Sequence, residues 1–383
     1  MQNVFVESTN IISALGNSTS ENFQSIMLGK SGIKQHFNPE INDEPIWASL
    51  IHEQQLISLS SEIKDAEKFT RYEKIIIASI SDSQKLSSLD FSSKETIFIF
   101  STTKGNISLL EENKTLPELY ARLSLMHSAK IICALFKNEN EPIVISNACI
   151  SGVVALLYAR RILESGKYKN AIVIGADTVS KFVFSGFLSF QALSQKICQP
   201  FSLNRDGINL GEAAATVVLT TEKLEKIKPI QILDGAVTND SNHISGPSRT
   251  GEELSYAINN SLQLSSLSPN EIGFISAHGT GTLFNDEMEA KAFSLSGLVN
   301  TPINSLKGYF GHTLGAAGIV ESIICFLSLQ NDIIIPTLGF TEIGVSAPIN
   351  ICSTITKKEM KYCLKSASGF GGCNATLLFS SKN

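Results

Sequence analysis

The sequence predicts an α/β fold made of two related halves. Short β-branched runs alternate with helical patterns along the whole chain, which is typical of buried sheets covered by helices. Two segments, EPIVISNACISGVVALLYARRIL and TPINSLKGYFGHTLGAAGIVESIICFLSL, share a strand, a polar turn and a long apolar helix. Their strand prolines are 160 residues apart (302 − 142), and so are Thr216 and Thr376 near the ends of the halves (376 − 216). A repeated offset indicates internal duplication, with chance similarity between two βα units as the alternative.

Ten runs rich in β-branched residues are the expected strands, five in each half. The N-terminal runs are Asn3–Val6, Thr96–Phe100, Pro142–Ser146, Asn170–Gly175 and Ala214–Thr220. The C-terminal runs are Ile230–Ala236, Ile272–Ser276, Thr301–Ser305, Tyr362–Ala367 and Ala375–Ser380. Helical segments connect these runs, so we expect mainly parallel sheets. The charged stretch 222–228, closed by Pro229, is the expected seam between a half of residues 1–225 and a half of residues 226–383.

Length and composition indicate a compact globular protein. The chain has 383 residues, of which 43% are hydrophobic and 17% charged. Its formal net charge of −5 argues against nucleic-acid binding, which normally needs a clustered basic surface. The start lacks the features of a secretory signal, and the most apolar later stretch, from Gly318 to Leu329, is short and contains Glu321. We therefore expect no membrane span and a cytoplasmic protein.

The seven cysteines are scattered, and none forms a C-x-x-C pair or stands near histidine at metal-ligand spacing. The sequence therefore predicts neither a disulfide framework nor a metal site. Most of these cysteines are expected to be buried as small hydrophobic residues, so a reactive one must be identified by its surroundings.

Cys149 is the candidate nucleophile, because it follows the expected strand Pro142–Ser146 and precedes a helix that begins near Gly152. At a helix N-terminus, unpaired N–H groups and the positive end of the helix dipole favour the thiolate, the nucleophilic form of sulfur. The small neighbours Ala148 and Ser151 permit a tight turn. A cysteine at a helix start is more often structural than catalytic, so Cys149 needs partners.

Two histidines are the candidate partners. His278 follows the strand Ile272–Ser276 in the string SAHGTGT, at the strand end where ligands of α/β folds gather. His312 lies in SLKGYFGHTLGAAG, in the turn that the 160-residue offset makes the counterpart of the turn carrying Cys149. The two turns are expected to face each other across one cavity, although a histidine in a polar loop is often an ordinary loop residue.

Two further features point to the same region. Glu321 interrupts an apolar helix running from Gly315 to Leu329, and a buried carboxylate would need a partner, for which Lys307 is the candidate. A solvated helix edge is the alternative. The glycine-rich turn SGFGGCN, residues 368–374, precedes the last strand, and Phe370 within it is expected to be a hinged apolar gate or a packing anchor.

On these residues the chain resembles the elongating β-ketoacyl-acyl-carrier-protein synthases of the thiolase superfamily. The motifs that carry the resemblance run nearly end to end: LGKSGI, NACISG, IGAD, PFSLNRDGINLGE, HGTGTLFNDEME, KGYFGHTLGAAG and GFGGCN. Their order, with one cysteine and two histidines among them, is highly specific. The resemblance implies a thiolase fold, in which two pseudo-twofold related βαβ halves form a five-layered αβαβα sandwich.

The resemblance also implies an acyltransferase that forms carbon–carbon bonds by decarboxylative condensation. Cys149 would accept an acyl group from acyl carrier protein, and the backbone N–H groups of Cys149 and Phe370 would form the oxyanion hole. His278 and His312 would stabilise the enolate formed when a malonyl group on the carrier loses CO₂. Because loss of CO₂ drives the reaction, the resemblance implies no metal and no redox cofactor, only the phosphopantetheine arm of the carrier.

The remaining site residues receive supporting roles from the same resemblance. Thr280 and Thr282 match positions that hydrogen-bond the pantetheine arm. Lys307, counted with the catalytic residues, and Glu321 match an ionic pair that orders the site. The acyl gate is matched by three residues of the glycine-rich turn: Gly369, Phe370 and Gly371.

Three residues depart from the family pattern. Ile150 replaces the small residue that usually follows the nucleophile, Ser368 stands where a phenylalanine is common, and Cys373 replaces a threonine. The chain is also shorter than typical housekeeping members, with compressed loops between the nucleophile and the first histidine. Acyl length and pathway therefore stay open, between bulk fatty acids and a specialised pathway such as aryl polyene, pigment or polyketide synthesis.

The resemblance implies two kinds of partner: acyl carrier protein, and a second subunit that is either identical, in a homodimer, or a chain-length factor, in a heterodimer. Rival functions are a non-catalytic subunit like a chain-length factor, which typically lacks the nucleophile, and a degradative thiolase, which would need a second catalytic cysteine near Cys373. Four basic residues in one charged stretch are candidates for docking the acidic carrier, with a solvated helix face as the alternative: Lys64, Lys68, Arg71 and Lys74.

Overall fold

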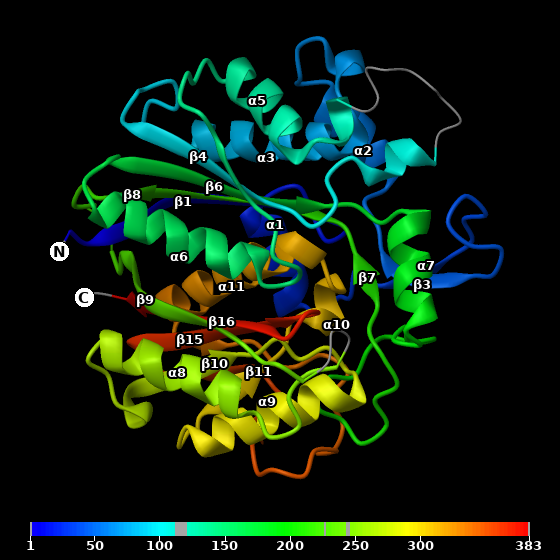
Figure 1. Ribbon diagram of the computed structural model, residues 1–383, viewed down its shortest axis with the longest axis vertical. Coiled ribbons are helices and arrows are strands. Elements are labelled where there is room, and N and C mark those ends of the chain that lie inside the picture. Colours follow the sequence, from blue (N-terminus) through cyan, green and yellow to red (C-terminus); the bar gives the residue numbers. More distant parts are fainter. Residues whose placement is uncertain (1, 112–120, 226, 243–245, 382–383) are drawn as a thin grey trace.

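Five layers of helix and sheet alternate through the molecule, as Figure 1 shows from the side. The computed structural model describes residues 2–111, 121–225, 227–242 and 246–381. One outer layer contains α2 (Glu53–Ser60), α3 (Arg71–Lys85) and α5 (Leu125–Leu135). The central layer contains α1 (Thr19–Met27), α6 (Ser151–Glu164) and α11 (Ala317–Asn331), and the other outer layer contains α8 (Glu252–Leu264) and α9 (Leu283–Leu295). The thiolase-type αβαβα sandwich is thereby confirmed.

All ten expected strands, five from each half, are present in an eleven-stranded sheet, whose remaining strand is the short edge strand β13 (Asn350–Ile351). The N-terminal strands are β1 (Val4–Ser13), β4 (Thr96–Ser101), β5 (Ile143–Ile145), β6 (Asn170–Asp177) and β8 (Ala213–Thr220). The C-terminal strands are β9 (Ile230–Asn239), β10 (Ile272–Ser276), β11 (Pro302–Asn304), β15 (Tyr362–Gly369) and β16 (Cys373–Ser381). In both halves the spatial order is third, second, fourth, fifth and first strand. The repeated order indicates that one topology occurs twice.

The sheets are mixed, so the prediction of mainly parallel strands is wrong. In each half the second strand is parallel to its two neighbours, whereas the other two pairings are antiparallel. In the C-terminal half the cause is the short turn 370–372, which joins β15 to β16 as a hairpin and leaves no room for a crossover helix. Two residue pairs between β1 and β9, Val4 with Ile232 and Phe5 with Gln231, join the halves into one sheet.

Shorter elements connect the layers and carry part of the site. The helical ones are α7 (Lys181–Ser189), α10 (Lys307–Phe310), η1 (Ala66–Lys68), η2 (Ile107–Leu110), η3 (Pro269–Glu271) and η4 (Leu314–Ala316). The short strands are β2 (Lys34–His36), β3 (Ile46–Ser49), β7 (Leu210–Gly211), β12 (Ile333–Ile334), β13 (Asn350–Ile351) and β14 (Thr356–Lys357). The expected seam includes residue 226, which lies outside the described residues.

Matching polar contacts mark the duplication inside the sandwich. Thr216 on β8 shares a 2.8 Å hydrogen bond with Ser79 on α3. Thr376 on β16, 160 residues later, shares a 2.6 Å hydrogen bond with Ser261 on α8. In each half, therefore, the same hydroxyl pair ties the fifth strand to the outer helix.

The central helices α6 and α11 are in backbone contact. A Cβ atom on Gly318 would lie 2.5 Å from the backbone nitrogen of Val153, and one on Gly152 would lie 2.8 Å from that of Ile319. The segment Leu314–Asn331 is long and apolar enough to span a membrane, yet 83% of it is buried inside the protein. It is thus the core helix of the sandwich, and its apolar character follows from burial on all sides.

We predict that Gly318→Ala lowers the free energy of unfolding by about 1–3 kcal/mol, because the added methyl group must push α6 and α11 apart. Gly186→Ala on α7 is the matched control, since nothing lies within 4 Å of a Cβ atom there. That change should be neutral or stabilise by about 0.5–1 kcal/mol through helix propensity. Urea unfolding followed by circular dichroism gives both values. Equal effects of the two substitutions would contradict the close helix contact.

Candidate active site

Cys149 lies in a strained turn between β5 and α6. Ala148 has φ of 44°, a left-handed conformation that costs a residue with a side chain about 1–2 kcal/mol. Ser151 secures this turn, because its hydroxyl accepts from the Asn147 N–H at 2.8 Å and donates to the Ala148 carbonyl at 2.6 Å. The turn holds Cys149 two residues before Ser151, the first residue of α6, near the helix N-terminus as predicted.

The backbone of His312 is held by the PFSLNRDGINLGE segment. Its N–H donates to the carbonyl of Asn209 at 2.7 Å, and its carbonyl accepts from the N–H of Gly211 at 3.0 Å. Gly211 has no space for a side chain, since a Cβ atom would lie 2.1 Å from the Phe310 carbonyl oxygen. This motif therefore fixes the position of one imidazole ring.

Hydrogen bonds to its backbone N–H and carbonyl groups hold His278 in place. Its N–H donates to the buried carboxylate of Glu289 at 2.8 Å, and the next N–H, of Gly279, donates to the same carboxylate at 2.6 Å. Its carbonyl accepts from Lys307 Nζ at 3.0 Å. Glu289 belongs to α9, so the outer helical layer and the centre of the protein together position this histidine.

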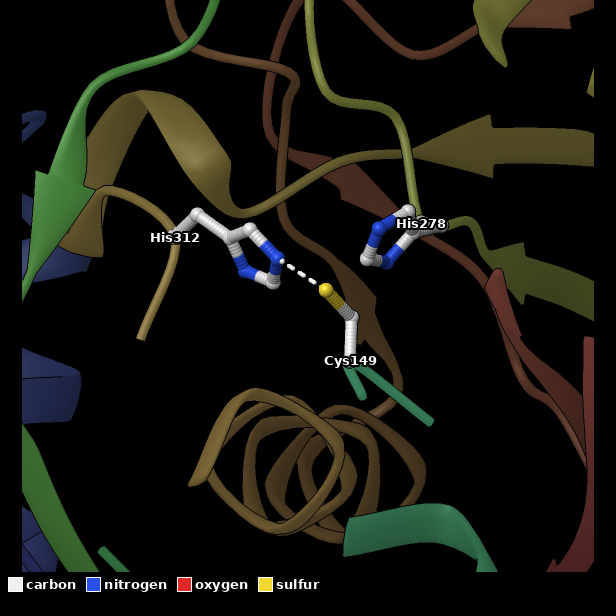
Figure 2. A group of neighbouring side chains, drawn as sticks. All are labelled: Cys149, His278 and His312. Carbon is white, nitrogen blue, oxygen red and sulfur yellow. Dashed lines mark hydrogen bonds between the residues drawn. The ribbon is translucent and has the colours of Figure 1, made fainter. Parts of the chain in front are cut away.

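The three predicted residues meet in one cavity. Figure 2 shows the Cys149 thiol between the two imidazole rings. Cys149 Sγ is 2.9 Å from His312 Nε2, and the ring centroids of His278 and His312 are 5.1 Å apart. Sγ and one ring nitrogen from each histidine all lie within 4.8 Å of one another. Residues far apart in sequence thus form one compact reactive group.

Lys307 and Glu321 form the expected ion pair, and both are buried. The alternative of a solvated helix edge for Glu321 is therefore wrong. Lys307 does not line the cavity but lies behind His278. Its expected place among the catalytic residues stays a prediction, and its side chain contacts the His278 carbonyl and the Glu321 carboxylate.

Burial shifts the pKa values of the three reactive groups in the direction that favours their neutral forms. The pKa values of both histidines lie well below the usual value, first because the rings are buried and then because of the nearby Lys307 ammonium. Burial also raises the pKa of the Cys149 thiol to about 12, with Lys307 and the Phe370 N–H acting in the opposite direction. The helix N-terminus was expected to favour the thiolate, whereas burial shifts the pKa of this thiol in the opposite direction.

A cavity of about 260 Å³ opens onto this group. The predicted pantetheine residues Thr280 and Thr282 line it, and their hydroxyls are 2.8 Å apart. Its apolar wall includes Phe370, whose ring centroid is 5.6 Å from that of Phe187 and 5.1 Å from that of Phe190. Phe370 is 37% exposed, and its expected role as a gate or a packing anchor stays a prediction.

The glycines beside Phe370 differ in their surroundings. Gly369 lines the cavity, and a Cβ atom there would lie 3.0 Å from the Cys149 backbone nitrogen. Gly371 does not line it, and its φ of 87° requires glycine at the turn. One glycine thus provides close approach and the other provides the turn.

The three departures from the family pattern lie near the nucleophile. Ile150 is completely buried in the core. Ser368 lines the cavity, and its hydroxyl donates to Asn374 Oδ1 at 2.8 Å. Cys373 is buried outside the cavity lining, with its thiol directed to the Phe370 carbonyl at 3.5 Å. The cysteine that a degradative thiolase would need therefore does not open onto the cavity.

The candidate docking residues divide into two kinds. Arg71 pairs with Glu53 and, at 2.9 Å, with the buried carboxylate of Glu212, so it is part of the framework. Lys68 pairs with the adjacent Asp65. Lys64 and Lys74 have no ion pair within the described part of the chain, and they remain the candidates for a charged partner.

Sequence reasoning missed several residues that shape the site. Phe187 on α7, Phe190 directly after it and Glu289 on α9 were not identified as site residues from the sequence. Lys365 could have been noticed as a buried charge, because it is the one charged residue in the expected strand Tyr362–Ala367. Asp177, at the end of β6, accepts hydrogen bonds from Thr103 and Gly315 and ties the N-terminal half to the turn that follows His312.

Comparison with known families gives two matches that together span more than half of the chain. Residues 99–224 match the family described as Beta-ketoacyl synthase, N-terminal domain. Residues 230–341 match Beta-ketoacyl synthase, C-terminal domain. The first match contains Cys149, and the second contains His278 and His312, so the reactive group is divided between the two.

Individual proteins agree with these matches. A 3-oxoacyl-[acyl-carrier-protein] synthase 2 of Mycobacterium leprae is 32% identical over 247 residues, which are 61% of this chain and 59% of that protein. The protein of the same name from Vibrio harveyi is 26% identical over 98% of both chains. Among solved structures, one chain of the complex of the ketosynthase ApeO with its chain length factor ApeC, from Xenorhabdus doucetiae, matches with a TM-score of 0.88 and 25% identity, covering 100% of this chain and 98% of that one.

We predict that alkylation of Cys149 by iodoacetamide accelerates about tenfold per pH unit between pH 7 and 9, because a thiol whose pKa is raised to about 12 exposes more thiolate with every unit. Lys307→Met should slow the reaction further, since the Lys307 charge lowers this pKa. Peptide mass mapping assigns the modification, with Cys149→Ser as the control. A rate already constant above pH 7 would show a resting thiolate and contradict the assignment.

Proposed function

The chain belongs to the β-ketoacyl synthase family, and we propose that it condenses an acyl group held on Cys149 with a malonyl group on acyl carrier protein, giving a β-ketoacyl carrier protein. The observation that carries this proposal is the meeting of one thiol and two imidazoles, with 2.9 Å between Cys149 Sγ and His312 Nε2. A nucleophile within hydrogen-bond distance of a base fits covalent acyl transfer.

In the first half-reaction the Cys149 thiol attacks the carbonyl carbon of an acyl thioester. A new C–S bond forms, and the C–S bond to the carrier breaks. Because the resting thiol is protonated, its proton passes to His312 Nε2 and from there to the departing pantetheine sulfur. The backbone N–H groups of Cys149 and Phe370 stabilise the negative charge that develops on the carbonyl oxygen.

In the second half-reaction a malonyl thioester loses CO₂, and the electrons of the broken C–C bond form an enolate. A neutral imidazole can donate its one N–H to this enolate oxygen, and the lowered pKa values of His278 and His312 fit that role. His312 takes this role in the tautomer that carries the proton on Nε2, after the thiol proton has passed to the departing pantetheine sulfur. The enolate carbon then attacks the Cys149 thioester. The new C–C bond forms as the C–S bond to Cys149 breaks, and the β-ketoacyl product leaves on the carrier. The released Cys149 thiolate takes one proton from water, which balances the charge of the carboxylate lost as CO₂.

The substrates enter on the phosphopantetheine arm of acyl carrier protein. Thr280 and Thr282 bind that arm, and Phe370 moves away from Phe187 and Phe190 to admit the acyl chain. Loss of CO₂ supplies the driving force, so the mechanism needs no metal and no redox cofactor. Lys307 and Glu321 support His278 from behind and do not contact substrate.

We also propose the assembly and cellular context. The unit of function is a dimer, either of two identical chains or of this chain with a chain-length factor. The structural match to one chain of a complex between a ketosynthase and its chain length factor favours the second form and, with it, a specialised pathway. The boundary between residues 225 and 226 divides the two related halves, and the enzyme is cytoplasmic.

Intact mass spectrometry tests the proposed function. Wild-type protein mixed with a panel of acyl carrier proteins should gain the mass of one acyl group, and with malonyl carrier protein it should then form the β-ketoacyl carrier and CO₂. Cys149→Ala should abolish the acyl adduct. A protein that never becomes acylated would support a non-catalytic partner subunit, and condensation with acetyl donors but without malonyl groups would support a thiolase.

The carrier-docking role of Lys64 and Lys74 has its own test. The double variant Lys64→Glu/Lys74→Glu should raise KM for acyl carrier substrates about tenfold, because two reversed charges repel the acidic carrier. Reaction with a small acyl-pantetheine thioester should stay unchanged. Lys357→Glu, on β14 of the other half, is the control. Equal loss with carrier and small substrate would contradict docking at this surface.

A further inference from the structure

Lys365 is a second buried lysine behind the site. It lies within β15, and its side chain has no exposed surface. Its ammonium group donates to the carbonyls of Ser276 at 3.1 Å, Ala277 at 3.2 Å and Ser366 at 2.6 Å. It also pairs with Glu321 Oε2 at 2.7 Å. Four oxygen atoms thus surround an ammonium group that has three N–H donors.

The two lysines act on one continuous segment. Glu321 places one carboxylate oxygen on Lys307 and the other on Lys365. Lys307 contacts the carbonyl of residue 278, and Lys365 contacts the carbonyls of residues 276 and 277. Three successive carbonyls at the end of β10 are therefore held by two ammonium groups that share one carboxylate.

The same strand secures the opposite side of this segment. Ser366, next to Lys365 on β15, donates its hydroxyl to Glu289 Oε1 at 3.0 Å. Glu289 accepts the N–H groups of His278 and Gly279. Two consecutive residues of β15 thus support both the carbonyl side and the N–H side of the turn carrying His278.

We propose that Lys365 is a positioning residue for His278, fixing the imidazole for the decarboxylation half-reaction. The proposal rests on the proposed condensation. Lys365 does not line the cavity, and its hydrogen bonds reach His278 through the carbonyls at the end of β10. Its charge has a second effect in the same direction, because after burial it is one of the groups that lower the pKa of both histidines and so keep the rings neutral.

Kinetic separation of the half-reactions tests this role. Lys365→Met should lower kcat for malonyl decarboxylation about 10–100-fold, since a small displacement of a reacting group is costly. KM for the malonyl carrier should stay within about threefold, and the rate of acyl transfer to Cys149 should fall much less than decarboxylation. The reason is that the Lys365 ammonium contacts the segment carrying His278 directly and acts on His312 only through its charge. Equal losses in both half-reactions, or no loss in decarboxylation, would overturn the proposal.

Lys358, which lies between β14 and β15, provides a control lysine that also contacts β10. Its ammonium donates to the Gly273 carbonyl at 2.9 Å, near the end of β10 that lies away from the site. Lys358→Met should alter thermal stability without changing the ratio of the two half-reactions. If Lys365→Met and Lys365→Gln both fail to fold while Lys358→Met folds, Lys365 serves folding, and the positioning role is wrong.

A spectroscopic readout separates this inference from the proposed function. The groups around the His278 ring and its backbone are His312, Cys149, Lys307, Lys365 and Glu289. Removing the Lys365 charge should raise the pKa of the His278 imidazole. NMR of ¹⁵N-histidine-labelled protein measures this pKa, and the His278→Asn variant assigns the signal. If Lys365→Met leaves the pKa of the His278 imidazole unchanged, the positioning role of Lys365 is wrong, whether or not the wild-type protein decarboxylates malonyl groups. If that pKa rises but the wild-type protein shows no decarboxylation, only the proposed function is wrong.

Discussion

The contact between Gly152 and Gly318 determines where chemistry can occur in this protein. Because neither residue has a side chain, α6 and α11 approach until their backbones touch. The N-terminal ends of both helices then lie together, and the turn before α6 carries Cys149 while the turn before α11 carries His312. The 2.9 Å between thiol and imidazole is therefore a consequence of helix packing in the central layer.

Much of the fold and the reactive group was accessible from the sequence, and particular residues explain why. All ten expected strands are runs rich in β-branched residues, and the equal spacing of the pairs Pro142/Pro302 and Thr216/Thr376 reveals the duplication. The direction of the strands could not be predicted from the sequence, because the residues of a strand are of the same kind whether a hairpin or a crossover connection follows. The supporting charges were only partly accessible, since burial of Lys365 and Glu289 depends on contacts between distant elements.

Burial has opposite effects on different groups of the site. It raises the pKa of the thiol and of Glu289, and it lowers the pKa of both histidines, so it disfavours charge at every one of them. Lys307, Lys365 and Glu321 are stable as a buried set because each ammonium contacts the carboxylate and backbone carbonyls at once. The cost of these charges is offset by their network, and the reacting groups stay neutral.

Because the reactive group is divided between the two halves, the site depends on substitutions leaving the relative position of the halves unchanged. The sulfur comes from one half and both imidazoles from the other, while the sheet joins the halves through only two residue pairs between β1 and β9. Neither half alone holds the full set, and a rigid shift of about 1 Å between them would already misplace the sulfur from its base. Substitutions that loosen the central helical layer are therefore expected to silence the enzyme well before they unfold it.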